Sequence, residues 1–382
     1  MRMVTAMSTA TSPVGRPARS VPPAINRVGV VGAGVMGSGI AQWCAARGFE
    51  VVLRDAQPAA LMRAGEVING LFAEAVRRGK LDATTAAAGQ ARLSLTVDWT
   101  GFAECDLVIE AIVEDVAAKR ALFAELGEIV RPDALLASNT SALPIEEIAG
   151  HVPQPERTLG LHFFNPVSRM RLVELVRSRD TDAAVVSAAQ RWVEILGKTA
   201  VICRSSPGFV VTRVLFFYLN AACSLVEEGV AIPAIDRAMR DWGWPMGPMR
   251  LIDEVGVDVT DFIFGEMAHY FPMRFVRTTL CADLLTAGFR GRKNGASAGF
   301  YTYAGNPALP NPAVETLLTR GALKTNGGMS DEEIAARLMQ VMREEARRCV
   351  EEGVVAAATD VDRAMTLGAG YPPSRGSLLA PE

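Results

Sequence analysis

An imidazole and a carboxylate stand in two neighbouring apolar stretches and form a candidate acid–base pair. His162, one of three histidines, lies in the run Leu159–Phe164, and Glu174 lies in a second strand-like run after an Asn-Pro turn. A lone histidine in an apolar strand is more commonly a core group. A buried carboxylate, however, needs a partner that offsets its desolvation, and an imidazole serves well. The carboxylate orients the imidazole in return, so the pair is predicted to remove the proton of an alcohol.

A glycine-rich turn provides the second candidate site. The segment 30–37 reads Val-Val-Gly-Ala-Gly-Val-Met-Gly, follows a predicted strand and opens a predicted helix. Gly32 permits a tight turn, Gly34 lets the backbone approach a pyrophosphate, and Gly37 lets helix and strand pack closely. The helix N-terminus adds unpaired N–H groups and a positive partial charge. Together these features predict a dinucleotide site.

The identity of that dinucleotide depends on Asp55, which ends the next predicted strand. A carboxylate roughly 20 residues after such a turn accepts hydrogen bonds from ribose hydroxyls and repels a 2′-phosphate. Asp55 therefore favours NAD over NADP. Its neighbour Arg54 is the one nearby residue that would suit a phosphate instead.

Ser141 closes a polar turn, Ser138-Asn139-Thr140-Ser141, that directly follows another predicted strand. Two roles are open to it. Its hydroxyl can hydrogen-bond a substrate hydroxyl, or it can cap the N-terminus of the helix predicted through 145–147.

The segments that must position these residues alternate between short runs of branched or aromatic apolar residues and longer stretches with helical periodicity. This alternation predicts a parallel sheet covered on both faces by helices. The predicted strands are Arg27–Val31, Val51–Asp55, Leu107–Ala111, Ala134–Ser138, Leu159–Phe164 and Ala200–Cys203, and the helices between them are Gly37–Arg47, Gln57–Arg78, Val116–Val130 and Ala183–Leu196. After Ser205 the chain becomes almost entirely helical, with helices expected over Ser206–Glu228, Ile232–Trp242, Met249–Phe271 and Ser330–Glu352.

The helical half contains a weak internal repeat. The segments Val226–Val230 and Asp236–Met239 recur as Val350–Val354 and Asp362–Met365, each followed by a proline turn. A duplicated helical unit is the simplest explanation, and two such units could bury a shared face. The predicted domains are a disordered tail at 1–24, favoured over a transit peptide, a dinucleotide-binding domain at 25–204, a helical substrate or dimerisation domain at 205–305, and a second helical repeat at 306–382 that stops soon after its turn.

Composition narrows the class of protein. A net charge of -3 gives no global field that favours nucleic acid or an anionic membrane. Six scattered cysteines without paired spacing predict reduced thiols in the cytosol, with neither a disulfide framework nor a zinc site. The longest apolar run, Phe209–Val226, includes Arg213 and Asn220, so it is interpreted as a buried helix of a soluble protein and not as a membrane span.

From Asn26 to Arg375 the chain resembles the 3-hydroxyacyl-CoA dehydrogenase family, especially the dehydrogenase portion of bacterial multifunctional fatty-acid oxidation proteins. The motifs that carry the resemblance are the glycine turn with Met36, Ile109–Glu114 with Lys119, Ser138–Ser141, His162–Pro166, Pro207–Phe209, Pro245–Pro248 and Arg292–Gly295. The resemblance implies a Rossmann-like α/β NAD-binding domain followed by all-α domains, with the active site in the cleft between them.

The resemblance also implies roles for single residues. His162 would be the general base, Glu174 its orienting carboxylate, and Ser141 would touch both the substrate hydroxyl and the nicotinamide. The substrate would be an L-3-hydroxyacyl-CoA, oxidised with NAD to a 3-ketoacyl-CoA in fatty-acid β-oxidation. The residues implied to line the NAD site are Gly32, Gly34, Met36, Gly37, Asp55, Val113, Glu114, Lys119, Ser141 and Asn165.

Thr212 departs from the family, which has asparagine at the substrate carbonyl. A lost hydrogen bond there would cost about 1–3 kcal/mol, or roughly 5- to 150-fold in rate. This departure leaves open a carnitine-type or other hydroxy-acid dehydrogenase, or a catalytically weakened NAD-binding homologue. Because no hydratase domain is recognised, a separate enoyl-CoA hydratase or thiolase is an expected partner. Phe216–Leu219 is open to two interpretations, the surface of a homodimer or an ordinary core. Arg77, Arg78 and Lys80 are candidates either for the CoA phosphates or for a solvated basic helix end.

Overall fold

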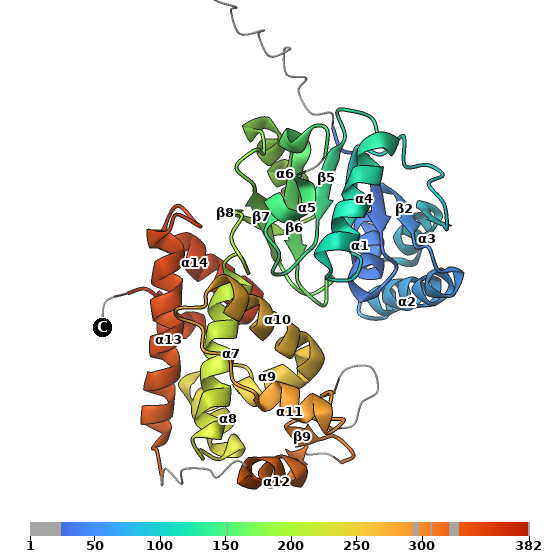
Figure 1. Cartoon of the computed structure of the whole chain (residues 1–382). Coiled ribbons are helices and arrows are strands. Elements are labelled where there is room, and N and C mark those ends of the chain that lie inside the picture. The colour runs from blue at the N-terminus through green and yellow to red at the C-terminus, as the bar shows by residue number, and fades with distance from the viewer. Residues whose placement is uncertain (1–23, 151, 293–297, 306–307, 321–327, 381–382) are drawn as a thin grey trace, which may run out of the picture.

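The computed structural model describes residues 24–380 except for 151, 293–297, 306–307 and 321–327, and it comprises an α/β part followed by a helical part (Figure 1). The predicted disordered tail, residues 1–24, lies outside the described residues apart from Ala24. The change from α/β to helical structure falls after residue 204, where the last strand of the sheet ends.

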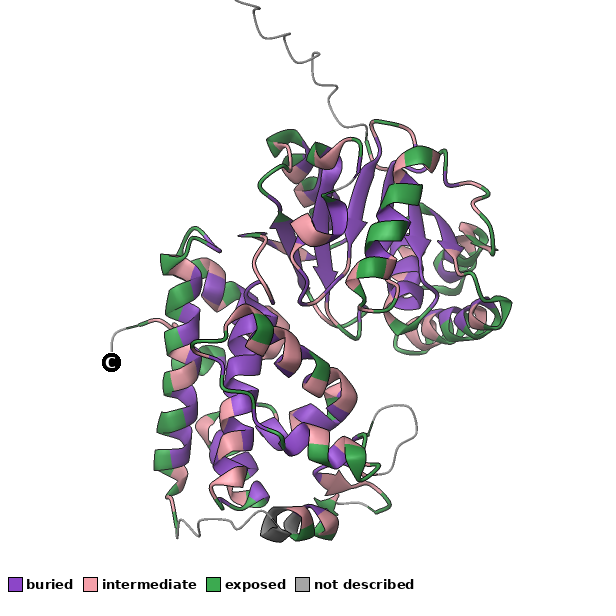
Figure 2. Ribbon diagram, viewed as in Figure 1, coloured by how far each residue is buried: buried purple, intermediate pink, exposed green. Residues whose placement is uncertain are grey.

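The described residues of the α/β part form one eight-stranded sheet with the strand order β3-β2-β1-β4-β5-β6-β7-β8. Branched and aliphatic residues make its central strands almost fully buried, as Figure 2 shows by their colour. The strands are β1 (Arg27–Val31), β2 (Glu50–Arg54), β3 (Leu93–Thr96), β4 (Leu107–Glu110), β5 (Leu135–Ser138), β6 (Thr158–Phe163), β7 (Leu172–Arg177) and β8 (Thr199–Arg204).

Helices cover both faces of this sheet, as the alternation of apolar runs predicts. Successive residues of β4 show the two layers: Leu107 and Ile109 belong to one apolar core, whereas Val108 belongs to the other. The helices of this part are α1 (Val35–Ala46), α2 (Pro58–Arg77), α3 (Ala83–Ala91), α4 (Val116–Ile129), α5 (Ile145–Ala149) and α6 (Ala183–Ile195).

Strand β7 departs from the predicted parallel arrangement because it runs antiparallel to β6. Only residues 164–171 connect these two strands. A parallel connection needs a crossover of about a dozen residues or more, so this short loop can only return the chain in the opposite direction. The antiparallel register sets His162 directly opposite Glu174.

The helical part is built around α7, most of which is buried. Its elements are α7 (Val211–Glu227), α8 (Ile232–Trp242), α9 (Pro248–Val255), α10 (Val257–Tyr270), α11 (Leu280–Thr286), α12 (Pro312–Arg320), α13 (Asp331–Glu351) and α14 (Ala358–Ala364), with a short hairpin of β9 (Tyr301–Thr302) and β10 (Leu309–Pro310). The residues of Phe216–Leu219, from which a dimer surface was inferred, are buried within this chain.

The start of α7 was predicted five residues too early, at Ser206. Gly208 and Phe209 adopt left-handed backbone angles, with φ of 71° and 51°, so the helix cannot begin before them. The single helix expected over Met249–Phe271 is likewise divided into α9 and α10 at Gly256, whose φ is 105°. By contrast, the predicted capping box of Ser330 and Glu333 opens α13.

All six cysteines are buried and unpaired, as their scattered positions predict. Among the described residues, no helix has both the length and the apolar composition that crossing a bilayer requires.

Replacement of Gly37 by alanine should disrupt the glycine turn. A Cβ at this position would lie 1.8 Å from the carbonyl oxygen of Gly32, so helix and strand must separate. We expect Gly37→Ala to lower the free energy of unfolding by at least about 2 kcal/mol and to weaken NAD binding more than tenfold. Urea denaturation and NAD titration measure both effects.

The matched control is Gly70→Ala on the exposed side of α2, where an added Cβ meets no atom within 4 Å. This change should raise the free energy of unfolding by about 0.5–1 kcal/mol, because alanine favours a helix over glycine. Equal stability of Gly37→Ala and wild type would contradict the close packing of the turn.

Candidate functional site

The structure brings His162 and Glu174 together at the centre of the site. The two residues are cross-strand partners, and His162 Nδ1 lies 2.7 Å from Glu174 Oε2. The histidine is 5% exposed and the glutamate 0%. The imidazole Nε2 makes no hydrogen bond with any described residue. An oriented imidazole whose second nitrogen is open can accept a proton from a bound hydroxyl group.

The second oxygen of Glu174 is held by the helical part of the molecule. Its Oε1 accepts hydrogen bonds from the backbone N–H groups of Val210 and Val211, each at 3.0 Å. These are amides at the N-terminus of α7, where the partial positive charge of the helix favours an anion. Sequence reasoning missed this contact because it began the helix at Ser206. The Pro207-Gly208 pair was the signal that could have delayed the start.

Aromatic rings border the imidazole. The ring centroids of Phe164 and Phe209 lie 4.3 and 5.8 Å from that of His162. Phe209 carries the left-handed backbone noted above, a conformation that costs free energy in a residue with a side chain. Thr212, in the first turn of α7, is 5% exposed, and its hydroxyl has no hydrogen-bond partner among the described residues.

The glycine turn and Asp55 meet at the carboxyl ends of β1 and β2. Asp55 Oδ2 accepts a hydrogen bond of 2.8 Å from the backbone N–H of Ala33, between the first two glycines of the turn. An added Cβ on Gly34 would meet nothing within 4 Å, so the space beside the N-terminus of α1 is open. The cap residue of α1 has no side chain to occupy the first N–H groups. This edge therefore fits the pyrophosphate and ribose of a dinucleotide.

Arg54, the residue that could have suited a 2′-phosphate, packs on an aromatic ring. Its guanidinium carbon lies 3.8 Å from the centroid of the Trp99 ring. The Arg54 guanidinium therefore makes a cation–π contact with the Trp99 ring.

A buried network of charges lies at the ends of β4 and β5. Lys119, which is 1% exposed, binds Glu110 Oε1 at 2.5 Å and Glu114 Oε2 at 3.1 Å. Ser138 donates a hydrogen bond of 2.6 Å to the other oxygen of Glu110. Glu114 Oε1 accepts hydrogen bonds from the Thr140 hydroxyl and from a backbone amide of the same turn. The single ammonium thus serves two carboxylates.

The two carboxyl groups of this network differ in their titration. Burial raises the pKa of Glu110, although Lys119 and Ser138 partly oppose the shift. Burial would also raise the pKa of Glu114, but the Lys119 ammonium and the Thr140 hydroxyl outweigh it and lower that pKa. Glu114 is therefore an anion at neutral pH, and its side chain is 24% exposed. Sequence reasoning named Glu114 and Lys119 but missed Glu110, the partner that Lys119 approaches most closely.

Ser141 belongs to this network through its backbone, which donates a hydrogen bond of 3.0 Å to Glu114 Oε1. Its hydroxyl has no partner among the described residues and is free to bind a ligand. The alternative role as a helix cap is wrong, because α5 begins after Pro144 without a side-chain cap. Met36 is half-buried, Asn165 is exposed and Val113 is 70% exposed, so all three can contact a ligand.

The basic residues considered for CoA phosphates end α2 and the turn that follows. Arg77 and Arg78 both pair with Glu74, and Lys80 is exposed. The ion pairs occupy both guanidinium groups, so these contacts give no support to a phosphate site there.

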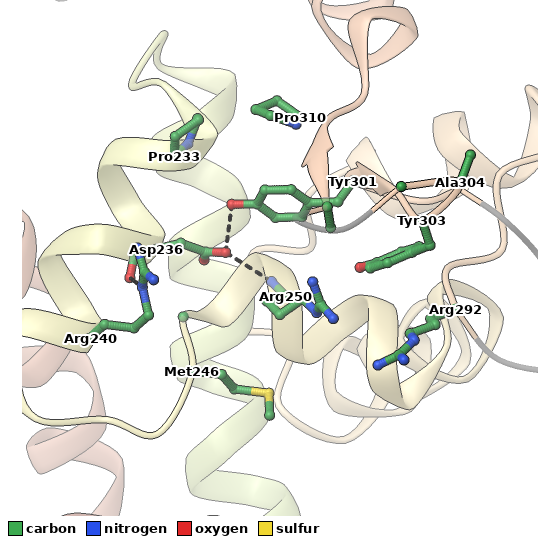
Figure 3. A pocket seen from close by; sticks show the side chains of 13 residues that line it. Pro233, Asp236, Arg240, Met246, Arg250, Arg292, Tyr301, Tyr303, Ala304 and Pro310 are labelled. Carbon is green, nitrogen blue, oxygen red and sulfur yellow. Dashed lines mark hydrogen bonds between the residues drawn. The ribbon is translucent and has the colours of Figure 1, made fainter.

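A cavity of about 890 Å3 lies in the helical part, between α8, α9 and the β9 strand (Figure 3). Its polar groups bind one another: the hydroxyl of Tyr301 and the backbone N–H of Arg250 both donate to Asp236 Oδ2. Burial raises the pKa of Asp236 despite these hydrogen bonds. None of the residues predicted for the NAD or substrate site lines this cavity.

Comparison with known proteins identifies two family models along the chain. Residues 27–206 match the NAD binding domain of 3-hydroxyacyl-CoA dehydrogenase, and residues 208–303 match the C-terminal domain of the same family.

Solved structures agree with this match. A 3-hydroxybutyryl-CoA dehydrogenase from Escherichia coli K12 is 32% identical, with a TM-score of 0.80 over 91% of this chain and 89% of its own. FadB2 from M. tuberculosis is 42% identical, with a TM-score of 0.71 over 74% of this chain and 100% of its own. The (S)-3-hydroxybutyryl-CoA dehydrogenase of Ralstonia eutropha is 33% identical, with a TM-score of 0.69 over 74% of this chain and 100% of its own.

Removal of the buried ammonium should destabilise the protein in a pH-dependent way. Lys119→Met leaves Glu110 without its cation, and we expect a loss of about 3–5 kcal/mol in the free energy of unfolding near neutral pH. Because the pKa of Glu110 is raised in the folded state, its charged form destabilises the fold as pH rises above the unfolded value. The loss should therefore be smaller at pH 5 than at pH 8, as urea denaturation at both values will show.

The control is Lys80→Met, which removes an exposed ammonium. Its free energy of unfolding should stay within about 0.5 kcal/mol of wild type at both pH values. If Lys119→Met lowers the free energy of unfolding by the same amount at both pH values, the raised pKa of Glu110 is contradicted.

Proposed function

Because this chain belongs to the 3-hydroxyacyl-CoA dehydrogenase family and is an NAD-dependent oxidoreductase, we propose that it oxidises an L-3-hydroxyacyl-CoA to the 3-ketoacyl-CoA with His162 as general base. The observation that carries the proposal is the 2.7 Å contact between His162 Nδ1 and Glu174, which leaves Nε2 open. The substrate class rests on the relatives, two of which are 3-hydroxybutyryl-CoA dehydrogenases by name.

In the proposed reaction the substrate O–H proton passes to His162 Nε2 as the carbon–oxygen bond becomes double. NAD supplies the acceptor for the hydride that leaves the same carbon. Glu174 holds the imidazole in the tautomer with its proton on Nδ1 and faces the positive charge that develops on the ring. Because Glu174 is fully buried and its other oxygen is bound to two amides, it has little freedom to turn away.

The proposed NAD site uses the open helix N-terminus at Gly34 for the pyrophosphate and Asp55 for the ribose hydroxyls. Glu114, with Lys119 behind it, lies beside the Ser138–Ser141 turn and would face the nicotinamide end. Met36, Val113 and Asn165 stay proposals on the strength of the family resemblance alone. The free hydroxyl of Ser141 is available to the substrate hydroxyl.

A separate enoyl-CoA hydratase or thiolase also remains a proposal, and so does the predicted homodimer, although the Phe216–Leu219 segment that suggested it is buried within this chain. The two partner enzymes are proposed on chemical grounds. Hydration of an enoyl thioester gives a 3-hydroxyacyl thioester, and a 3-ketoacyl thioester is a substrate for thiolysis.

His162→Ala should abolish most of the chemistry and leave the cofactor site intact. Loss of a general base lowers kcat by about 10²- to 10⁴-fold. The measurement is NADH consumption with acetoacetyl-CoA, alongside NAD titration by fluorescence, where we expect less than a twofold change. The matched control is His269→Ala on the exposed side of α10, which should keep wild-type kcat. Equal turnover by His162→Ala and wild type would remove His162 from the mechanism.

The substrate class is tested by the wild type itself. We expect turnover of acetoacetyl-CoA and of L-3-hydroxybutyryl-CoA to exceed that of free 3-hydroxybutyrate, carnitine and gulonate by more than 100-fold in kcat/KM. Preference for a free hydroxy acid would instead establish the carnitine-type or hydroxy-acid alternative.

Thr212→Asn should improve the enzyme if its substrate is an acyl-CoA. The amide reaches further than the hydroxyl and offers two donors, so it can restore a hydrogen bond to the thioester carbonyl. We expect kcat/KM for acetoacetyl-CoA to rise by roughly 5- to 150-fold. Thr212→Val is the control, since it keeps the shape and removes the hydroxyl. A decrease in kcat/KM for Thr212→Asn would indicate a substrate that requires the shorter side chain.

A further inference from the structure

Two ion pairs between α7 and α13 repeat each other. Arg213 binds Glu352 at 2.8 Å, and Arg337 binds Glu228 at 2.6 Å. Arg337 and Glu352 follow Arg213 and Glu228 at the same interval in the sequence. Each helix thus contributes one arginine and one glutamate to a reciprocal contact. Reciprocity of this kind is the property of a two-fold interface between like surfaces.

The turns that follow α8 and α14 show the same reciprocity. An added Cβ on Gly243 would lie 3.3 Å from Pro372, and one on Gly370 would lie 3.3 Å from Pro245. The rings that stand next to these prolines, Trp244 and Tyr371, pack edge to face with centroids 5.9 Å apart. We call the segment from α13 to the C-terminal turn the second helical unit (331–380). It packs on α7 and α8 through reciprocal contacts, as two similar helical units do.

The two ion pairs nevertheless differ in one respect. The Arg337 side chain is 43% exposed, whereas that of Arg213 is 0% exposed and has a further partner, Glu345, at 2.5 Å. Arg274 approaches the same two carboxylates, Glu345 at 3.4 Å and Glu352 at 2.8 Å. The residue of α7 that corresponds to Glu345 in the repeat is Ala221, so α7 has no such carboxylate at that position. The cluster around Arg213 is thus an addition to the symmetric contact.

That addition lies beside the residues that hold the base. Arg213 is in the first turn of α7, and its backbone N–H binds the Gly208 carbonyl at 2.8 Å. Two amides at the start of the same turn, those of Val210 and Val211, donate to Glu174. Glu174 in turn binds the imidazole of His162. A continuous series of contacts therefore leads from α13 to the imidazole.

We propose that Glu345, a residue of the second helical unit, is a positioning residue for the catalytic pair that acts through Arg213 and the first turn of α7. This inference rests on the proposed function of His162. Without Glu345, the Arg213 guanidinium keeps Glu352 as its remaining carboxylate, and a buried guanidinium that loses one of two carboxylates is drawn toward the other. Because Arg213 is part of the first turn, its movement displaces the amides that bind Glu174, and a displacement of about 1 Å near a reacting group can cost 10²-fold in rate.

The second helical unit is also fixed to the sheet near this point. The backbone N–H of Arg204, at the end of β8, donates to the Val354 carbonyl at 2.7 Å. Arg204 also donates through its guanidinium to the carbonyl of Glu352 at 2.6 Å. The unit that carries Glu345 is therefore held on both sides of the loop 205–210, which connects the sheet to α7.

The test is a double-mutant cycle of Glu345→Gln and Glu174→Gln in the full-length protein, measured as kcat with the best substrate of the wild type. We expect Glu345→Gln to lower kcat roughly 10- to 100-fold with less than a twofold change in NAD affinity. In the Glu174→Gln background the same change should cost less than twofold, because the contact it serves is already lost. Multiplicative losses would overturn the proposal.

The repeat provides the matched control. Glu228→Gln breaks the equivalent ion pair with Arg337, far along α7 from the catalytic pair, and should leave kcat within twofold of wild type. An equal kcat for Glu345→Gln and Glu228→Gln would also overturn the proposal. If Glu345→Gln does not fold, Glu345→Asp keeps the charge and withdraws it by one methylene. It should lower kcat by about 3- to 10-fold, again without a further loss in the Glu174→Gln background.

A spectroscopic measurement separates this inference from the proposed function. The chain has only three histidines, so the ring Nδ1–H resonance of His162 can be assigned by substitution. A hydrogen bond to a carboxylate moves this resonance downfield. The downfield signal should be present in wild type and Glu228→Gln and shifted upfield or lost in Glu345→Gln. An unchanged signal in Glu345→Gln refutes the positioning role, whereas a wrong substrate class affects only the turnover of the wild type.

Discussion

The site depends on one constraint, the complete burial of the Glu174 carboxylate between a sheet and a helix. A buried anion is tolerated only where hydrogen bonds and opposite charge replace water. Here each oxygen has its own source of stabilisation: the imidazole on one side and two amides of the α7 N-terminus on the other. The carboxylate therefore does two things at once. It orients His162, and it joins the α/β part to the helical part at the place proposed for the substrate.

The buried ammonium of Lys119 applies the same principle at the neighbouring strands. It neutralises Glu110 inside the sheet and still reaches Glu114, which keeps a charged carboxylate at the surface of the site. The turn that ends in Ser141 is bound to that carboxylate. The Lys119 network and His162 thus lie at the carboxyl ends of their strands, the edge at which open α/β sheets bind ligands. Glu174 reaches the same edge from the amino-terminal half of the antiparallel strand β7.

The sequence predicted those parts of the fold that follow from local periodicity and short-range turns. Helices such as α8 and strands such as β1 follow from apolar spacing, and the proximity of His162 and Glu174 follows from an Asn-Pro turn between two short strands. The late start of α7 was missed because Phe209 adopts a left-handed backbone that its residue type disfavours. Only the packed structure imposes that conformation. The partners of Lys119 and Arg213 were missed or incomplete because side-chain pairing across the fold leaves no periodic trace.

The burial of Arg213 is informative because stability alone does not require it. A buried ion pair seldom stabilises a protein more than apolar side chains of the same size would, since desolvation of both charges consumes the Coulomb attraction. The equivalent pair of Arg337 and Glu228 is half-exposed and avoids most of that penalty. What a fully buried arginine next to two glutamates provides instead is a fixed direction, because the N–H groups of a planar guanidinium donate to carboxylates only in a fixed geometry. That directional requirement is what the first turn of α7 needs if its amides are to stay aimed at Glu174.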